Sequence, residues 1–205
     1  MSGGRPLIAI DGPAGAGKST VSRAVARRLG LDRLDTGAMY RSVAWEALRR
    51  AVDPGDHDAV ARIAAGALIE VGPVVRINGH DVTSAIRTPE VSRAVSVVAA
   101  NPEVRRELVT RQRAWAAQRD GGVVEGRDIG SVVFPEATVK VYLTAAPEER
   151  ARRRGHDESP DGLAQRDLLD STREASPLTE APDAHLLDTT GRSVEDVVEE
   201  VLSWL

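Results

Sequence analysis

Residues 7–20 have the sequence LIAIDGPAGAGKST, in which a short apolar run leads directly into a glycine-rich turn. The apolar run, Leu7 to Ile10, is typical of a buried β-strand. The turn at residues 12–19 matches the pattern G-x-x-x-x-G-K-[S/T] in full. The residues that follow have apolar side chains at helical spacing and lead to Gly30, a common helix stop. A strand, a glycine-rich turn and a helix in this order predict an α/β fold with a phosphate-binding loop.

Each part of this loop has a physical role in binding phosphate. Glycines let backbone N–H groups face the phosphates with no Cβ in the way, and the helix that starts near Lys18 adds its positive end. The Lys18 ammonium can reach the β- and γ-phosphates, and the Ser19 hydroxyl can ligate Mg²⁺. We therefore predict a nucleoside triphosphate site with Mg²⁺ as cofactor. The residues assigned to it are Gly12, Pro13, Ala14, Gly15, Ala16, Gly17, Lys18, Ser19 and Thr20.

The rest of the chain alternates short apolar strands with longer helical stretches, which predicts a parallel sheet covered by helices on both faces. The expected strands are residues 123–124, 138–143 and 185–188, and the expected helices are about 39–50, 57–68, 89–119, 147 onward and 194 onward. We expect the long helical region to break at Asn101-Pro102, because proline restricts the residue before it. Asn78-Gly79 suits the positive φ angles of a tight turn and predicts a small hairpin.

Composition limits the classes of protein to which the chain can belong. With 205 residues, 41% apolar and 28% charged, it has the size and composition of one ordinary globular domain. The net charge is −4, whereas nucleic-acid-binding domains usually have a basic excess, so we expect no nucleic-acid partner. The sequence has no cysteine, which excludes disulfides and thiolate metal sites. No apolar run has the length of a secretory signal or a membrane span, so we expect no membrane partner and a cytoplasmic location.

The phosphate loop alone does not distinguish a kinase from a GTPase, a motor or an ATP-driven regulator. A GTPase would carry a guanine-reading N-K-x-D segment, and neither Lys18 nor Lys140, the two lysines of the chain, lies in one. The arginines instead favour a small phosphorylated acceptor. Arg127 comes just after a predicted buried strand, and ligands of doubly wound sheets gather at the carboxyl ends of strands. We therefore expect Arg127 and Asp128 to lie beside the loop.

Several stretches together resemble bacterial cytidylate kinases, in the right order and over nearly the whole chain. They are GPAGAGKST at residues 12–20, LDTGAMYR at 34–41, GRDIGSVVFPEA at 126–137 and the R-x-x-x-D-x-x-R spacing of Arg166, Asp170 and Arg173. The resemblance implies an enzyme that transfers the γ-phosphoryl group of ATP to CMP or dCMP with Mg²⁺. Its products would be ADP and CDP or dCDP.

The resemblance also implies a domain organisation. Residues 1–205 would form a single kinase domain with a P-loop kinase core. Within it, residues about 63–95 would belong to a small β-containing insert that binds the monophosphate, and residues about 150–166 would form a lid. This lid is shorter than is usual in the family. We expect lid contacts to ATP from Arg153, with Arg152 and Arg154 as the neighbouring candidates, and we expect a monomer.

By the same resemblance, the catalytic residues would be Lys18, Arg127 and Arg173. The residues that bind CMP divide by the part of the substrate that they contact. Arg41, Arg127 and Arg173 would hold the phosphate, Ser96, Arg105 and Asp128 would read cytosine, and Arg166 and Asp170 would face the ribose. Thr36 either contacts this substrate or caps the helix that follows it.

Two other functions are compatible with the phosphate loop. A kinase of another small metabolite, with a hydroxyl acceptor of the shikimate type, would need an acidic base, for which Asp35 or Asp128 could serve. A non-catalytic ATP-binding regulator would tolerate loss of the acceptor arginines, which are all present here. A monophosphate acceptor is already an anion and needs no general base, so positioning and charge neutralisation would suffice for catalysis.

Overall fold

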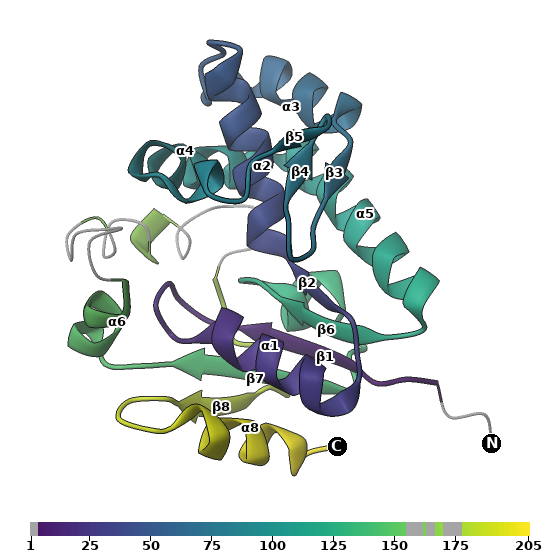
Figure 1. Cartoon of the computed structure of the whole chain (residues 1–205), viewed down its shortest axis with the longest axis vertical. Coiled ribbons are helices and arrows are strands. Elements are labelled where there is room, and N and C mark those ends of the chain that lie inside the picture. Colours follow the sequence, from purple (N-terminus) through teal and green to yellow (C-terminus); the bar gives the residue numbers. More distant parts are fainter. Residues whose placement is uncertain (1–3, 155–161, 163–166, 170–177) are drawn as a thin grey trace.

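The larger sheet of the protein is parallel and five-stranded. The computed structural model describes residues 4–154, 162, 167–169 and 178–205. The strand order is β2-β6-β1-β7-β8, with every neighbouring pair parallel (Figure 1). The strands are β1 Leu7–Asp11, β2 Arg33–Asp35, β6 Gly122–Glu125, β7 Val139–Thr144 and β8 His185–Asp188. The predicted α/β class with a parallel sheet is confirmed.

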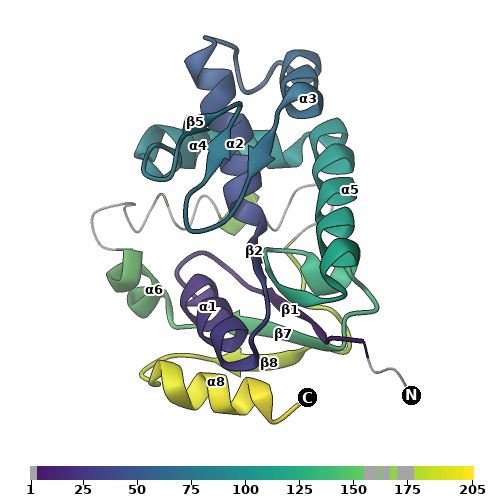
Figure 2. The same ribbon diagram turned by 45° about the vertical axis from the view of Figure 1, so that its right-hand side comes forward.

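Helices cover both faces of this sheet because side chains of β1 alternate between two cores. Ile8 and Ile10 belong to a core that includes α1 (Lys18–Leu29) and α8 (Val194–Leu202). Ala9 faces the opposite core, which includes α2 (Thr36–Arg49), α4 (Pro89–Ala100) and α5 (Pro102–Arg119). Figure 2 shows α1 and α8 side by side on their face, as their packing contacts also indicate.

The remaining helical elements lie on the second core or at the rims of the sheet. They are α2 Thr36–Arg49, α3 His57–Gly66, η1 Ala85–Arg87, α4 Pro89–Ala100, α5 Pro102–Arg119, the π-helical turn η2 Ile129–Val133 and α6 Pro147–Arg154. The predicted break at Asn101-Pro102 is confirmed. Asn101 Oδ1 accepts from the amides of Glu103 and Val104 at 3.0 and 3.4 Å, so it caps α5.

A small antiparallel sheet stands apart from the parallel one, in the order β3-β4-β5 (Figure 1). Its strands are β3 Ile69–Glu70, β4 Arg76–Ile77 and β5 His80–Asp81. The predicted turn is confirmed, since Asn78 and Gly79 have φ angles of 52° and 80°. Ile77 belongs to a separate small core that also includes Ile86 and Ala38 of α2. This core fixes the small sheet against α2.

Two elements at the edge of the site were not predicted from the sequence. The strand β2 has three residues, two of them charged, so it shows no apolar run. The turn η2 follows β6 and has a helical hydrogen-bond pattern that a five-residue apolar stretch does not reveal. Among the described residues, no helix combines the length and the apolar character needed to cross a lipid bilayer.

Candidate active site

A cavity of about 480 Å³ opens at the carboxyl ends of β2 and β6, between the phosphate loop and α2. Several elements that are distant in the sequence contribute to its wall: the loop, the starts of α2 and α5, and α4. Of the predicted site residues, the lining includes Ala14, Gly15, Gly17, Lys18, Ser19, Thr20, Thr36, Arg41, Ser96, Arg105, Arg127, Asp128 and Arg153. Gly12, Pro13 and Ala16 belong to the loop without lining the cavity. The candidates Arg166, Asp170 and Arg173 lie outside the described residues, as does most of the predicted lid.

The phosphate loop connects β1 to α1 in a conformation that requires glycine. Gly12, Gly15 and Gly17 have φ angles of 140°, 77° and 92°, which L-residues with a side chain rarely adopt. A Cβ on Gly12 would lie 2.0 Å from the carbonyl oxygen of Leu143, so the loop packs directly on β7. The close approach of two backbones explains why this position has no side chain.

Two cations meet at one carbonyl of the loop. Lys18 Nζ donates to the carbonyl oxygens of Gly12 and Pro13, each at 2.7 Å. Arg127 Nη1, from the turn after β6, donates to the same Gly12 oxygen at 2.7 Å. The structure therefore brings Lys18 and Arg127 together, although they are more than a hundred residues apart in the sequence. Both cations line the cavity.

Beneath the loop, Glu125 at the end of β6 gathers several polar side chains. Its carboxylate accepts from Ser19 Oγ at 2.9 Å, from Ser22 Oγ at 2.7 Å and from Arg33 Nη1 at 3.0 Å. Burial raises the pKa of Glu125 above its usual value, and the nearby Asp35 raises it further against the opposing effect of Arg33. The cluster holds the Ser19 hydroxyl beside a carboxylate at the cavity wall.

The start of α2 carries a second acidic group and its arginine partner. Asp35 accepts from the amide of Ala38 at 2.9 Å and therefore caps α2. Arg41 Nη2 donates to Asp35 Oδ2 at 3.0 Å. Burial alone would raise the pKa of Asp35, but Arg41, the Ala38 amide and Arg33 lower it below 3.8. Within the described part of the chain, Arg41 Nε is buried and has no hydrogen-bond partner.

The same region answers the question that the sequence left open about Thr36. Its hydroxyl donates to the carbonyl oxygen of Glu125 at 2.7 Å, and Asp35 rather than Thr36 caps the helix. The capping role considered for Thr36 is therefore wrong. The residue lines the cavity and ties the start of α2 to the end of β6.

A buried ion pair also lines the cavity. Arg105 of α5 donates through Nη2 to Asp128 Oδ2, and both side chains are almost fully buried. The Arg105 guanidinium also lies over the ring of Tyr40, 5.8 Å from its centroid. Ser96 of α4 lines the same end. This end of the cavity therefore combines a positively and a negatively charged side chain with apolar lining residues such as Val95 and Ala99.

A further acidic residue supports the turn that carries Arg127 and Asp128. Asp11, the last residue of β1, accepts from the amides of Ile129 and Gly130 at 2.8 and 2.7 Å. Burial raises the pKa of Asp11 to about 6, against the lowering effect of those two amides. Asp11 thus fixes the position of the turn after β6 relative to the phosphate loop.

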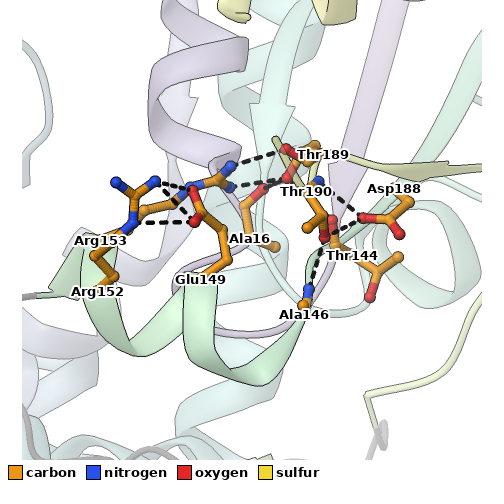
Figure 3. Close-up of polar contacts among 9 residues, drawn as sticks. All are labelled: Ala16, Thr144, Ala146, Glu149, Arg152, Arg153, Asp188, Thr189 and Thr190. Atoms are coloured by element: carbon orange, nitrogen blue, oxygen red, sulfur yellow. Dashed lines mark hydrogen bonds and ion pairs between the residues drawn. The ribbon is translucent and has the colours of Figure 1, made fainter. Parts of the chain in front are cut away.

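Arg153 of α6 lies at the outer side of the phosphate loop (Figure 3). Its Nη1 and Nη2 donate to Thr189 Oγ1 and to the Thr189 carbonyl oxygen, each at 2.8 Å. Arg152 pairs with Glu149 at 2.6 Å and is largely exposed. Arg153 lines both the main cavity and a second one of about 420 Å³, which the start of α8 and the loop before it also line.

The charged and aromatic residues of this site that were not predicted from the sequence include Asp11, Tyr40, Arg87 and Glu125. Asp11 and Glu125 are acidic residues at the carboxyl ends of buried strands, a signal that the sequence does contain. Arg87 and Tyr40 line the cavity from η1 and α2. For Arg87 the sequence offers no local signal, because it is one arginine among many.

A phosphate loop that faces an arginine-lined cavity at the strand ends defines the P-loop kinases as the class of this protein. Residues 8–205 match the family model described as Cytidylate kinase. The chain therefore belongs to the cytidylate kinase family.

Relatives agree with this placement, and a solved structure shares the fold. A cytidylate kinase from Solibacter usitatus is 50% identical over 97% of this chain and 91% of its own length. A bifunctional pantoate ligase/cytidylate kinase from Synechococcus sp. is 50% identical over 95% of this chain, which spans 43% of that relative. A gluconokinase structure from Sinorhizobium meliloti has a TM-score of 0.54 at 15% identity, covering 97% of this chain and 90% of its own, and shares the fold.

Proposed function

We propose that this protein transfers the γ-phosphoryl group of ATP to CMP or dCMP, giving ADP and CDP or dCDP. The observation that carries the proposal is one cavity that joins the phosphate loop to the buried Arg105–Asp128 pair. The loop suits the anionic donor, and the pair suits a planar base with both donors and acceptors on its edge. The family match and the named relatives support the same reaction.

The donor end fits Mg²⁺ as well as ATP. Mg²⁺ prefers oxygen ligands and usually binds through one or two protein oxygens together with substrate phosphates. Ser19 Oγ and the Glu125 carboxylate lie 2.9 Å apart at the cavity wall, which is a donor set of this kind. When bound, the ion would neutralise phosphate charge; Ser19 is the proposed ligand, with Glu125 beside it.

The acceptor end fits a nucleoside monophosphate. Arg41 lines the cavity with its buried Nε unpartnered among the described residues, as suits a group that binds a further anion. We assign the CMP phosphate to Arg41 and Arg127, and cytosine to Ser96, Arg105 and Asp128. Thr36 lies between the two ends. The assignments of Arg166, Asp170 and Arg173 remain predictions from the family resemblance.

Catalysis then consists of bringing two anions together and compensating their charge. Lys18 and Arg127, which share the Gly12 carbonyl, are the cations between donor and acceptor. Their preorganised charges stabilise the phosphoryl oxygens in the transition state. No group has to remove a proton, because the attacking oxygen of the monophosphate is already ionised.

The same geometry argues against a kinase that acts on a hydroxyl group. Such a kinase needs a carboxylate that is free to accept a proton from the acceptor. Asp35 caps α2 and pairs with Arg41, which holds its pKa low. Asp128 is paired with Arg105 inside the protein. Each candidate base is thus paired with an arginine, which opposes uptake of a proton.

We further propose the domain roles that the resemblance implies. Residues about 63–95, which include the small antiparallel sheet, would form the monophosphate-binding insert. Residues about 150–166 would form the lid, with Arg153 at its base. The second cavity, beside Arg153 and the start of α8, would receive the nucleoside of ATP. A monomeric state and a cytoplasmic location stay predictions of the sequence.

A coupled ADP-release assay with MgATP and CMP, dCMP, UMP or AMP tests the proposal. We expect turnover with CMP and dCMP to exceed that with AMP by at least about a hundredfold, because AMP lacks the pyrimidine edge that the pair would read. Turnover with AMP or UMP far above CMP would overturn the assignment of substrate. Absence of turnover with every monophosphate would favour an ATP-binding regulator.

Replacement of Arg127 by alanine tests its proposed place between donor and acceptor. We expect kcat/KM to fall by roughly a thousandfold, with ATP affinity nearly intact. Arg106→Ala is the matched control, because Arg106 is exposed and pairs with Glu103 on the surface. Equal losses of ATP and CMP affinity in Arg127→Ala would place this arginine in the donor subsite instead.

A further inference from the structure

Thr189 lies where three segments of the chain converge, just after β8 (Figure 3). Its side chain is buried, with 3% of the residue exposed. The hydroxyl oxygen is 3.2 Å from the carbonyl oxygen of Ala16 in the phosphate loop and 3.0 Å from that of Thr144 at the end of β7. The Thr189 amide also donates to Thr144 at 2.9 Å. One side chain therefore contacts the phosphate loop and the strand that supports it.

The third segment is α6, which contacts Thr189 through the side chain of Arg153. The guanidinium donates to both oxygens of Thr189 at 2.8 Å, and its Nε donates to Glu149 Oε1 at 2.9 Å. A Cβ on Gly17 would lie 3.5 Å from Arg153 Nη1, so the charged group sits directly against the phosphate loop. These bonds hold Arg153 in one orientation, between the two cavities that it lines.

We propose that Thr189 is a positioning residue that sets Arg153 against the phosphate loop for ATP binding. A hydroxyl has one proton, and Thr189 uses it toward a backbone carbonyl, either Ala16 or Thr144. Its lone pairs are then directed at the Arg153 guanidinium, and its own carbonyl supplies the second acceptor. The Thr189 oxygens thereby hold both Nη groups of Arg153 without adding a second carboxylate beside Glu149, so the guanidinium charge and its remaining donors serve the triphosphate. This inference rests on the proposed function only in taking ATP as the ligand.

The proposal also separates two neighbouring arginines of α6. The side chain of Arg152 is 76% exposed and pairs with Glu149. Arg153 is held by both Glu149 and Thr189. Arg153 is therefore the one of the two that Thr189 directs to ATP.

Equilibrium binding of MgATP, measured by calorimetry without any acceptor, tests the inference. In Thr189→Val the side chain keeps its shape and loses the hydroxyl, and we expect the Kd for MgATP to rise about tenfold. Thr189→Ser keeps the hydroxyl and should restore wild-type affinity. Thr190→Val is the matched control: Thr190 Oγ1 contacts the Ala146 amide and Asp188, at 2.8 and 2.6 Å, on the same loop. It should leave the Kd unchanged within about twofold.

A double-variant cycle distinguishes positioning from a purely structural role. If Thr189 acts through Arg153, Thr189→Val should weaken MgATP binding no further once Arg153 is alanine. Additive losses, or an unchanged Kd in Thr189→Val, would overturn the inference, as would an equal loss in Thr190→Val. The KM for CMP should stay constant in Thr189→Val. Failure of the wild-type protein to phosphorylate CMP would overturn the proposed function and leave this binding experiment valid.

Discussion

Compared with the donor end of the cavity, which is made mainly from consecutive residues of one loop, the acceptor end takes its side chains from α2, α4, α5 and the turn after β6. The donor end relies on backbone groups, and its conformation depends on glycines with positive φ at Gly12, Gly15 and Gly17. The acceptor end relies on side-chain charges, above all the buried pair of Arg105 and Asp128. Different substitutions should therefore damage the two ends.

The difference follows from what each end has to recognise. A triphosphate is a flexible anion without a unique edge, so inward-facing amides and one lysine suffice. A base has a fixed pattern of donors and acceptors, which oriented side chains such as Arg105 and Asp128 can match. Substitutions that change the local conformation or charge of the phosphate loop should therefore impair the donor end. Substitutions that remove a single side chain contributed by a distant part of the sequence should impair the acceptor end. The following four experiments test this contrast.

The largest effect should come from Lys18→Met at the donor end. Loss of the loop ammonium should lower kcat/KM by about a thousandfold, because its charge neutralises transferring phosphate. Steady-state kinetics with saturating CMP measures the loss. Lys140→Met makes the same chemical change outside both cavities, where the lysine pairs with Asp183, and should leave kcat within about twofold. Comparable losses in both variants would indicate a general effect of lysine removal.

At the acceptor end, Arg105→Met should remove the arginine charge that pairs with the buried Asp128 carboxylate. We expect the KM for CMP to rise about a hundredfold with little change for ATP. The free energy of unfolding should fall by about 3 kcal/mol, which urea titration measures. Arg106→Met, on the same helix, removes an exposed pair with Glu103 and serves as the control for α5. If Arg105→Met affected ATP and CMP equally, the two ends would not be separable.

Asp11 links the two ends, and its pKa of about 6 gives a pH test. The pKa of Asp11 is higher in the folded protein than its value of 3.8 in the unfolded chain. Its contribution to the free energy of unfolding is therefore fully present below pH 3.8 and is lost as the pH rises through about 6. From about pH 7 to about pH 4, wild type should therefore gain up to about 3 kcal/mol relative to Asp11→Asn. Urea unfolding of both proteins across this range gives the difference. Parallel pH profiles would contradict the assigned pKa.

The smallest effect should come from Ser96→Ala at the acceptor end. Loss of one neutral hydrogen bond should raise the KM for CMP about threefold to fivefold and leave the KM for ATP unchanged. Ser92 lies one turn earlier on α4, is buried to the same 8% exposure and does not line the cavity. Ser92→Ala should therefore leave both KM values unchanged. A larger effect in Ser92→Ala would remove Ser96 from the proposed cytosine contacts.

Prediction from the sequence succeeded where local chemistry was sufficient. The phosphate loop, the break before Pro102 and the Asn78-Gly79 turn follow from the conformational limits of glycine, asparagine and proline. It failed at β2, whose charged residues hide a strand that only pairing with β6 stabilises. It also failed at Asp11 and Glu125, whose roles depend on amides and hydroxyls that the fold brings to them.

The amino-acid order was enough to establish a parallel α/β fold, the triphosphate loop and the family, because each depends on contiguous residues with specific conformational needs. Which charged side chains meet, and around which space, depended on the packing of distant segments. Arg127 reaches the Gly12 carbonyl, Arg105 reaches Asp128, and Arg153 reaches Thr189 only after the strands have aligned. Electrostatic and hydrogen-bonding contacts act over a few ångströms, so the chain had to fold before these partners could be named.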